Sequence, residues 1–215
     1  MSTLSSQVAS KLLQIKAIKL QPQNPFMWAS GLRSPIYCDN RITLSHPKIR
    51  DFVKESLASK VFAFGEVDVV AGVATAGIAH GALLADKLGK PFVYVRSKTK
   101  AHGRQNQIEG EFSPGDKILV IEDLISTGMS SVAACDALID AGAKVVGVMA
   151  IFTYGFAKAA GVFDERKIPV ETLTNYRNIL NEAVDSQYIT DSEKNLLESW
   201  NKDPKTWSDN YTTSI

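Results

Sequence analysis

Two adjacent carboxylates and a run of hydroxyl residues share one short segment near the middle of the chain. Glu122 and Asp123 follow the apolar stretch 117–121, and Gly128 precedes a stretch with helical character at 129–140. Backbone N–H groups at the start of a helix attract phosphate, and glycine lets the backbone approach the anion closely. The carboxylates suit what adjoins a phosphate: sugar hydroxyls, a magnesium ion or developing positive charge. We therefore expect a phosphorylated sugar to bind to these residues: Glu122, Asp123, Leu124, Ile125, Ser126, Thr127, Gly128, Met129 and Ser130.

Two common nucleotide-binding motifs do not occur in the sequence. There is no G-x-x-x-x-G-K-[ST] segment and no G-x-G-x-x-G fingerprint for a dinucleotide. The simpler interpretation of residues 122–131 is a strand end with solvated acids and an ordinary helix cap, since acidic caps are common. The glycine and hydroxyl residues behind an apolar strand favour a phosphate site over that alternative.

A basic segment breaks the regular pattern between residues 95 and 117. Arg96, Lys100 and His102 are spaced two to four residues apart, in a stretch of about twenty residues without a clean period. Long connections of this kind in compact domains are usually functional lids or disordered. We expect a mobile lid over residues 96–112 whose cations face a bound anion; a solvated basic loop is the alternative.

The elements expected to position these residues alternate between strand and helix. Continuous apolar strands separated by helices indicate a parallel sheet covered on both faces. Open sheets of this type bind ligands beyond the carboxyl ends of their strands, where Glu122 and Asp123 are expected. The expected strands are 67–73, 92–95, 117–121, 144–151 and 170–173, and the expected helices between them are 76–88, 129–140 and 156–163.

The two ends of the chain are expected to add further helices. Apolar residues recur at helical spacing over the first 20 residues, which predicts an amphipathic helix there. Residues 26–41 look irregular, and Pro47 opens a second helix. Residues 175–200 look mostly helical, and the polar tail from Lys202 is expected to be loosely held.

Composition limits the classes of function. The chain has 215 residues, which suits one compact domain, and its net charge of +1 does not favour nucleic-acid or membrane-surface binding. No apolar run approaches the roughly 20 residues of a membrane span, and the N-terminus lacks an apolar signal region. Cys38 and Cys135 show no metal-ligand spacing and read as reduced thiols. We expect a cytoplasmic protein with no nucleic-acid or membrane partner.

Three segments resemble a known enzyme family. Residues 120–128 are similar to the phosphoribosyl-diphosphate-binding motif of the type I phosphoribosyltransferases. Residues 26–41 and 95–103 narrow the resemblance to orotate phosphoribosyltransferase, through its Ser-Gly…Ser-Pro…Tyr segment and its catalytic lid. The resemblance implies one α/β domain over 1–215 with a central parallel sheet flanked by helices. Its expected parts are a hood segment on the base side at 1–41, the core with the lid at 42–174, and C-terminal helices and tail at 175–215.

The reaction implied by the resemblance joins orotate to 5-phosphoribosyl 1-diphosphate, giving orotidine 5′-monophosphate and diphosphate. It implies that the turn 126–130 holds the 5′-phosphate and that Glu122 and Asp123 hold the ribose hydroxyls. Mg²⁺ would be held mainly by 5-phosphoribosyl 1-diphosphate, the ribose phosphate donor, with no direct protein ligand. A homodimer that shares its lid between subunits is also implied. By the same resemblance Arg96, Lys100 and His102 neutralise the diphosphate, Thr127 contacts orotate, and the catalytic residues are Lys100, His102 and Asp123.

The sequence departs from the family pattern at several positions. Ala29, Ala76 and Ser97 stand where many members carry lysine, and Tyr154 where many carry an arginine near the base. Residues 74–77 could present N–H groups to the diphosphate or form a plain tight turn. Two aromatic residues in the hood segment, Trp28 and Phe26, could stack on the base or simply pack.

Two rival functions remain open at this point. The donor motif also fits a phosphoribosyltransferase for another base, such as a purine or uracil, although residues 26–41 argue against it. A regulator that senses the donor without catalysis would need a nucleic-acid-binding surface, usually an added module rich in Lys and Arg. The N-terminal helix is short and carries few cations, so an enzyme is the favoured interpretation.

Overall fold

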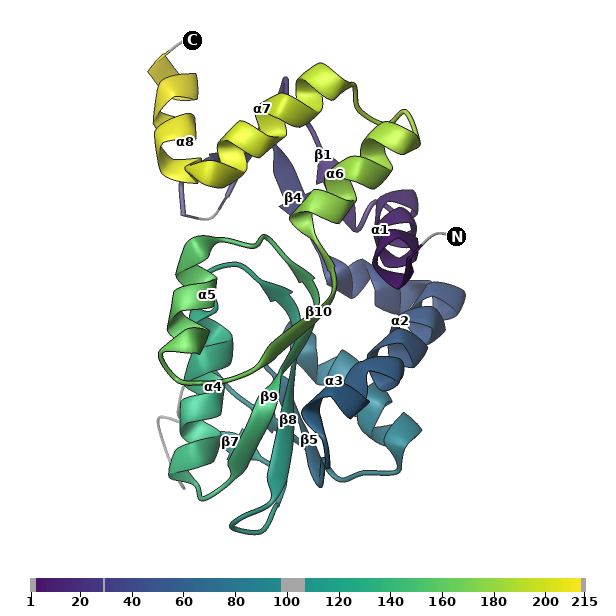
Figure 1. Ribbon diagram of the computed structural model, residues 1–215, viewed down its shortest axis with the longest axis vertical. Coiled ribbons are helices and arrows are strands. Elements are labelled where there is room, and N and C mark those ends of the chain that lie inside the picture. Colours follow the sequence, from purple (N-terminus) through teal and green to yellow (C-terminus); the bar gives the residue numbers. More distant parts are fainter. Residues whose placement is uncertain (1–2, 29, 98–106, 214–215) are drawn as a thin grey trace. The chain divides into compact units, whose positions relative to one another are not determined.

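The computed structural model describes residues 3–28, 30–97 and 107–213 (Figure 1). The chain divides into two compact units. One consists of Leu44–Leu173, and the other combines Met1–Thr43 with Thr174–Ile215. In the described part of the chain, no helix has the length and apolar character needed to cross a bilayer.

A six-stranded sheet in the order β10-β9-β8-β5-β6-β7 forms the centre of the larger unit. Strand β5 pairs in parallel with β6 and β8, and β8 pairs in parallel with β9, whereas the short β7 runs antiparallel to β6. The predicted parallel sheet is therefore confirmed, with an antiparallel edge strand added. The strands are β5 (Val69–Val73), β6 (Phe92–Val95), β7 (Ile108–Glu109), β8 (Lys117–Ile125), β9 (Lys144–Thr153) and β10 (Val170–Asn175).

Helices cover both faces of this sheet. Figure 1 shows α2 and α3 on one face and α4 and α5 on the other. Helix α3 ends at Gly89, whose left-handed φ of 61° reverses the chain as the sequence predicted. The helical segments are α2 (Pro47–Lys60), the 3-10 turn η2 (Val61–Phe64), α3 (Ala76–Leu88), α4 (Met129–Asp140) and α5 (Ala157–Asp164).

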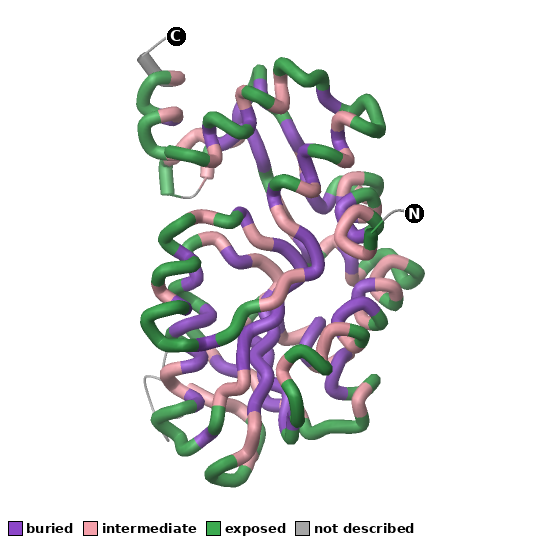
Figure 2. The backbone as a smooth tube through the Cα atoms, in the orientation of Figure 1, coloured by how far each residue is buried: buried purple, intermediate pink, exposed green. Residues whose placement is uncertain are grey.

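One apolar core of the larger unit lies between the sheet and α4. Strands β5, β8 and β9 are almost wholly buried, as Figure 2 shows, while the helices are exposed on their outer sides. Val120 of β8 and Leu138 of α4 are fully buried in this core, with Val148 of β9 beside them. A strand that is buried on both faces reads as a continuous apolar run, which is why β8 could be predicted from its sequence.

The smaller unit contains two antiparallel strand pairs and four helices in its described part. Strand β1 (Ile18–Leu20) pairs with β4 (Ile36–Cys38), and β2 (Phe26–Met27) pairs with β3 (Arg33–Ser34). Helix α1 packs against α6, and α8 packs against β3. The helices are α1 (Leu4–Gln14), α6 (Tyr176–Asp185), α7 (Asp191–Lys202) and α8 (Pro204–Thr213); the 3-10 helix η1 (Asn40–Ser45) follows β4.

Two predictions about the chain ends are wrong. The first helix ends at Gln14 rather than near residue 20, because Lys16 takes a left-handed φ of 58° and the next residues pair with β4. The tail after Lys202 forms helix α8 instead of remaining loose. Pro204 opens this helix, and the carboxylate of Asp203 accepts a hydrogen bond of 3.1 Å from the Thr206 N–H, a typical helix start.

Candidate active site

The two adjacent acids lie within strand β8 rather than after its end. The sequence predicted a strand that stops at residue 121, but β8 continues to Ile125 because it stays paired with β9 as far as the Ile125–Thr153 pair. Glu122 sits opposite Ala150 of β9 in this ladder. The extension places Glu122 among buried backbone instead of in solvent, so it is not a solvated acid at a strand end.

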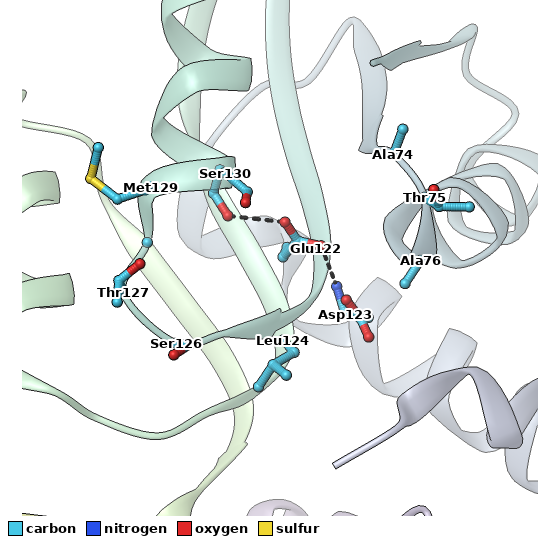
Figure 3. Close-up of a pocket in the computed structure, with 12 residues that line it drawn as sticks. Ala74, Thr75, Ala76, Glu122, Asp123, Leu124, Ser126, Thr127, Met129 and Ser130 are labelled. Carbon is cyan, nitrogen blue, oxygen red and sulfur yellow. Dashed lines mark hydrogen bonds between the residues drawn. The ribbon is translucent and has the colours of Figure 1, made fainter. Parts of the chain in front are cut away.

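Glu122 is held by hydrogen bonds to both of its carboxyl oxygens. The Asp123 N–H donates to Oε1 at 3.1 Å, and the Ser131 hydroxyl donates to Oε2 at 3.2 Å (Figure 3). Only 6% of Glu122 is exposed. Burial, followed by the charge of Asp123, raises the pKa of Glu122 from 4.5 to about 9. The carboxyl group of Glu122 is therefore protonated at neutral pH in the unliganded protein.

The turn after β8 leads into α4 through a glycine that no other residue could replace without strain. Gly128 has a φ of 78°, and a Cβ atom at this position would lie 2.8 Å from the Phe163 ring of α5. The first helical hydrogen bond of α4 runs from the Val132 N–H to the Gly128 carbonyl. Within the described residues, no hydrogen-bond acceptor is found for the backbone N–H groups of residues 126–131. These N–H groups, the candidate anion cradle, lie at the positive end of the helix dipole, which favours an anion.

One cavity of about 250 Å³ contains the acids and the anion cradle together. Its lining comes from three segments: residues 74–76, residues 122–124 and residues 126–131. Figure 3 shows Glu122 and Asp123 between the loop 74–76 and the turn that carries Thr127 and Ser130. The described lining includes two carboxyl groups and several hydroxyls but no lysine or arginine. It can hold a sugar with its phosphate, while any further negative charge on the ligand needs a cation from elsewhere.

The loop 74–76 reaches this cavity because α3 lies unusually close to the sheet. A Cβ atom on Gly77 would collide with the carbonyl oxygen of Ile121 in β8. A Cβ atom on Gly72 of β5 would lie 2.8 Å from the carbonyl oxygen of Gly77. Two glycines therefore permit the close approach that sets the start of α3 beside Glu122.

Comparisons with known proteins agree with this geometry. The model of the phosphoribosyl transferase domain family matches residues 42–187. The orotate phosphoribosyltransferase of Listeria monocytogenes is 54% identical over 206 residues, which cover 95% of this chain and 99% of that protein. The chain belongs to the orotate phosphoribosyltransferase family. A second member, from Phocaeicola vulgatus, is 54% identical over 96% of this chain and 98% of its own. The crystal structure of orotate phosphoribosyltransferase from Aeropyrum pernix superimposes with a TM-score of 0.74 at 26% identity, over 85% of this chain and 99% of that one.

The fold expected from the resemblance is thus confirmed as that of the orotate phosphoribosyltransferases. The residues expected to carry the leaving-group chemistry are placed only in part. Arg96 follows β6 and lies 3.6 Å from the Glu109 carboxylate, in a second cavity beside the first. Lys100 and His102 lie outside the described residues, as does most of the expected lid.

Aromatic residues near the expected base side are packed. The ring of Trp28 meets Trp200 edge-on at 5.7 Å, and its indole N–H donates to the Ile36 carbonyl at 3.3 Å. Tyr154 is 3% exposed and stacks on Phe156 at 5.3 Å. In the unliganded chain these rings serve as packing groups, and Tyr154 does not supply the charge of an arginine.

Sequence reasoning missed the partner that the structure gives to Glu122. Ser131 is one of the hydroxyl residues of the segment 122–131, and it is buried and bonded to the acid nine residues before it. The helical spacing offered one signal, since the first turn of α4 must lie beside the strand that precedes it. No cluster of three or more His, Cys, Asp or Glu side chains suited to a metal ion occurs in the described part of the chain.

Proposed function

We propose that the cavity at the carboxyl end of β8 holds 5-phosphoribosyl 1-diphosphate and that the protein transfers its ribose 5-phosphate to orotate. The products are orotidine 5′-monophosphate and diphosphate, in the pathway that makes pyrimidine nucleotides. One observation carries this proposal: paired carboxyl groups and unbonded backbone amides line a single cavity in a member of the orotate phosphoribosyltransferases. A ribose that bears a phosphate fits this combination of groups.

In this scheme the protein binds 5-phosphoribosyl 1-diphosphate at two places. The N–H groups of residues 126–130 bind the 5′-phosphate. The hydroxyls of Ser126, Thr127 and Ser130 are further hydrogen-bond donors. Glu122 and Asp123 bind the ribose hydroxyls, and the carboxylate of Asp123 stabilises the positive charge that develops on the ribose ring. Both carboxyl groups lie in a partly closed cavity, where electrostatic stabilisation is stronger than in water.

Mg²⁺ fits this site as a companion of the donor rather than as a resident ion. The described cavity lining offers carboxyl and hydroxyl oxygens, which Mg²⁺ prefers, but no cluster able to hold the ion alone. The ion would be held mainly by oxygens of the donor, with the carboxyl groups of Glu122 and Asp123 in the lining of the same cavity. When bound, it neutralises part of the diphosphate charge.

The diphosphate leaving group needs further positive charge from the protein. Arg96 is the described candidate, and Lys100 and His102 complete the set proposed from the sequence. Lys100 is proposed to assist departure of the diphosphate, and Thr127 to contact orotate. The proposal also includes a homodimer whose lid segments are shared between subunits, in the cytoplasm.

A spectrophotometric assay of orotate consumption tests the function directly. Purified protein with donor and Mg²⁺ should consume orotate, and uracil, hypoxanthine and guanine should neither react nor compete. Asp123→Asn should raise the donor KM and lower kcat together. Turnover of a purine in place of orotate would establish the rival base specificity. Absence of any turnover, combined with tight binding to RNA or DNA, would show a donor-sensing regulator instead.

A further inference from the structure

A second cavity adjoins the donor cavity at the N-terminus of α4. It has a volume of about 260 Å³ and shares Ala74, Met129 and Ser130 with the first cavity. Arg96 and Gln107 contribute to the rest of its lining. Arg96 is the one lysine or arginine among the described lining residues of the two cavities, so it supplies positive charge to this end of the donor site.

The backbone of Arg96 is fixed from both sides by Gln107. The Arg96 N–H donates to the Gln107 carbonyl at 2.9 Å, and the Gln107 side-chain amide donates to the Arg96 carbonyl at 2.7 Å. The neighbouring Val95–Ile108 pair belongs to the β6–β7 ladder. The Arg96 backbone is therefore held at the base of the lid segment, and only its side chain can respond to a ligand.

The guanidinium of Arg96 has a counter-ion but an incomplete set of hydrogen bonds. Its Nη1 atom lies 3.6 Å from Oε1 of Glu109, which is too long for a hydrogen bond. This nitrogen is buried, and no acceptor for it is found among the described residues. A buried donor without an acceptor is unfavourable, and an oxyanion that bonds to the guanidinium would relieve this cost.

We propose that Glu109 is a resident counter-ion of Arg96 that weakens the hold of the protein on the diphosphate end of the donor. This inference rests on the proposed function, because it assigns the diphosphate to the cavity that Arg96 lines. Glu109 lies on β7 opposite Tyr94 and does not line either cavity, so it acts through Arg96 as a positioning residue. An entering diphosphate must share the guanidinium with the carboxylate and is repelled by its charge. Glu109 thereby favours release of the product diphosphate at the expense of affinity.

Calorimetric titration with inorganic diphosphate, at constant Mg²⁺, measures this effect without any need for turnover. Glu109→Gln should lower the dissociation constant for diphosphate by about three- to five-fold at low ionic strength, the scale of a partly exposed ion pair. The gain should shrink as salt is added, since the screening length falls to about 3 Å at 1 M. In an Arg96→Gln background, Glu109→Gln should change the dissociation constant by much less, because the partner is gone.

Glu111→Gln is the matched control. It also removes one carboxylate charge, but from an exposed residue two positions further along the chain. It should leave the dissociation constant close to that of the unmodified protein. The inference fails if Glu109→Gln weakens diphosphate binding, or if the two variants behave alike. Thermal unfolding of both variants shows whether the fold is intact, and Glu109→Ala provides a second replacement. If the unmodified protein does not consume orotate, the proposed function is wrong. The diphosphate titration would still test the proposed effect of Glu109 on Arg96.

Discussion

Ser131 in the first turn of α4 donates a hydrogen bond of 3.2 Å to the buried carboxyl group of Glu122 in β8. The bond connects the strand that carries the two acids of the donor cavity with α4, the helix whose N-terminal N–H groups are proposed to bind the phosphate. Both residues are almost fully buried, at 2% and 6% exposure, so the bond lies largely away from solvent and its loss is costly. This hydroxyl group therefore couples the two halves of the site.

Ser131→Ala should weaken donor binding more than it affects orotate binding. Without the hydroxyl, one buried oxygen of Glu122 loses its hydrogen-bond donor. This loss costs about 1–3 kcal/mol and frees the carboxyl group to rotate. The donor KM should rise about tenfold or more, while the orotate KM stays nearly constant. Steady-state kinetics with each substrate varied in turn measures this difference. Ser131→Thr keeps a hydroxyl and should restore most of the donor affinity; equal damage by both substitutions would mean that volume matters and the bond does not.

Stability should depend on pH through Glu122. Its pKa is about 9 in the folded chain, where burial and the charge of Asp123 raise it from 4.5. The folded state therefore binds one more proton than the unfolded state between these values. The stability that this proton contributes is fully present below pH 4.5. It falls by roughly 1 kcal/mol per pH unit above that value and is lost once the pH has risen through 9.

Glu122→Gln removes this titration while it preserves the size of the side chain. The unfolding free energy of the variant, relative to that of the unmodified protein, should increase steadily from pH 5 to pH 9. Urea denaturation at several pH values in this window gives the comparison. Parallel stability curves for the two proteins would show that Glu122 is ionised in the folded state and that the assigned protonation is wrong.

Close packing of α3 on the sheet should make Gly77 intolerant of any side chain. In Gly77→Ala, the added Cβ would meet the carbonyl oxygen of Ile121, and neither backbone can move without shifting β8. We expect a loss of about 2 kcal/mol or more in unfolding free energy, as for other overpacked sites. Gly161→Ala in α5 is the matched control, because nothing lies within 4 Å of its Cβ position. It should be neutral or stabilising by up to about 1 kcal/mol, and an equal loss in both variants in urea would contradict the packing argument.

Local signals allowed much of the larger unit to be predicted from the sequence. The bounds of α3 and α4 agree with the prediction because apolar periodicity marks their bodies and glycines mark their ends. Strand β6 was likewise predicted with its observed bounds, from a short apolar run. Each of these features depends on residues that are neighbours in the chain.

Two of the errors arose where pairing between distant segments decides the structure. Strand β8 continues through Glu122 because β9 offers partners as far as Thr153, and no local pattern near residue 122 reveals that. Residues after Gln14 leave the helix to pair with β4, about twenty positions further along the chain. The protonated state of Glu122 follows from the same cause, since its burial depends on the length of β8.

Removal of Mg²⁺ should stop catalysis without unfolding the protein. The described lining of the donor cavity contains the carboxylate of Asp123 and no lysine or arginine, so a donor without a metal ion meets like charge there. With EDTA in excess, turnover should fall at least about a hundredfold and return when Mg²⁺ is restored. The unfolding temperature of the unliganded protein should stay the same, because no metal-binding cluster occurs among the described residues. A lower unfolding temperature in EDTA would reveal a resident ion, and unchanged turnover would mean that side chains of the protein supply all the positive charge that the diphosphate needs.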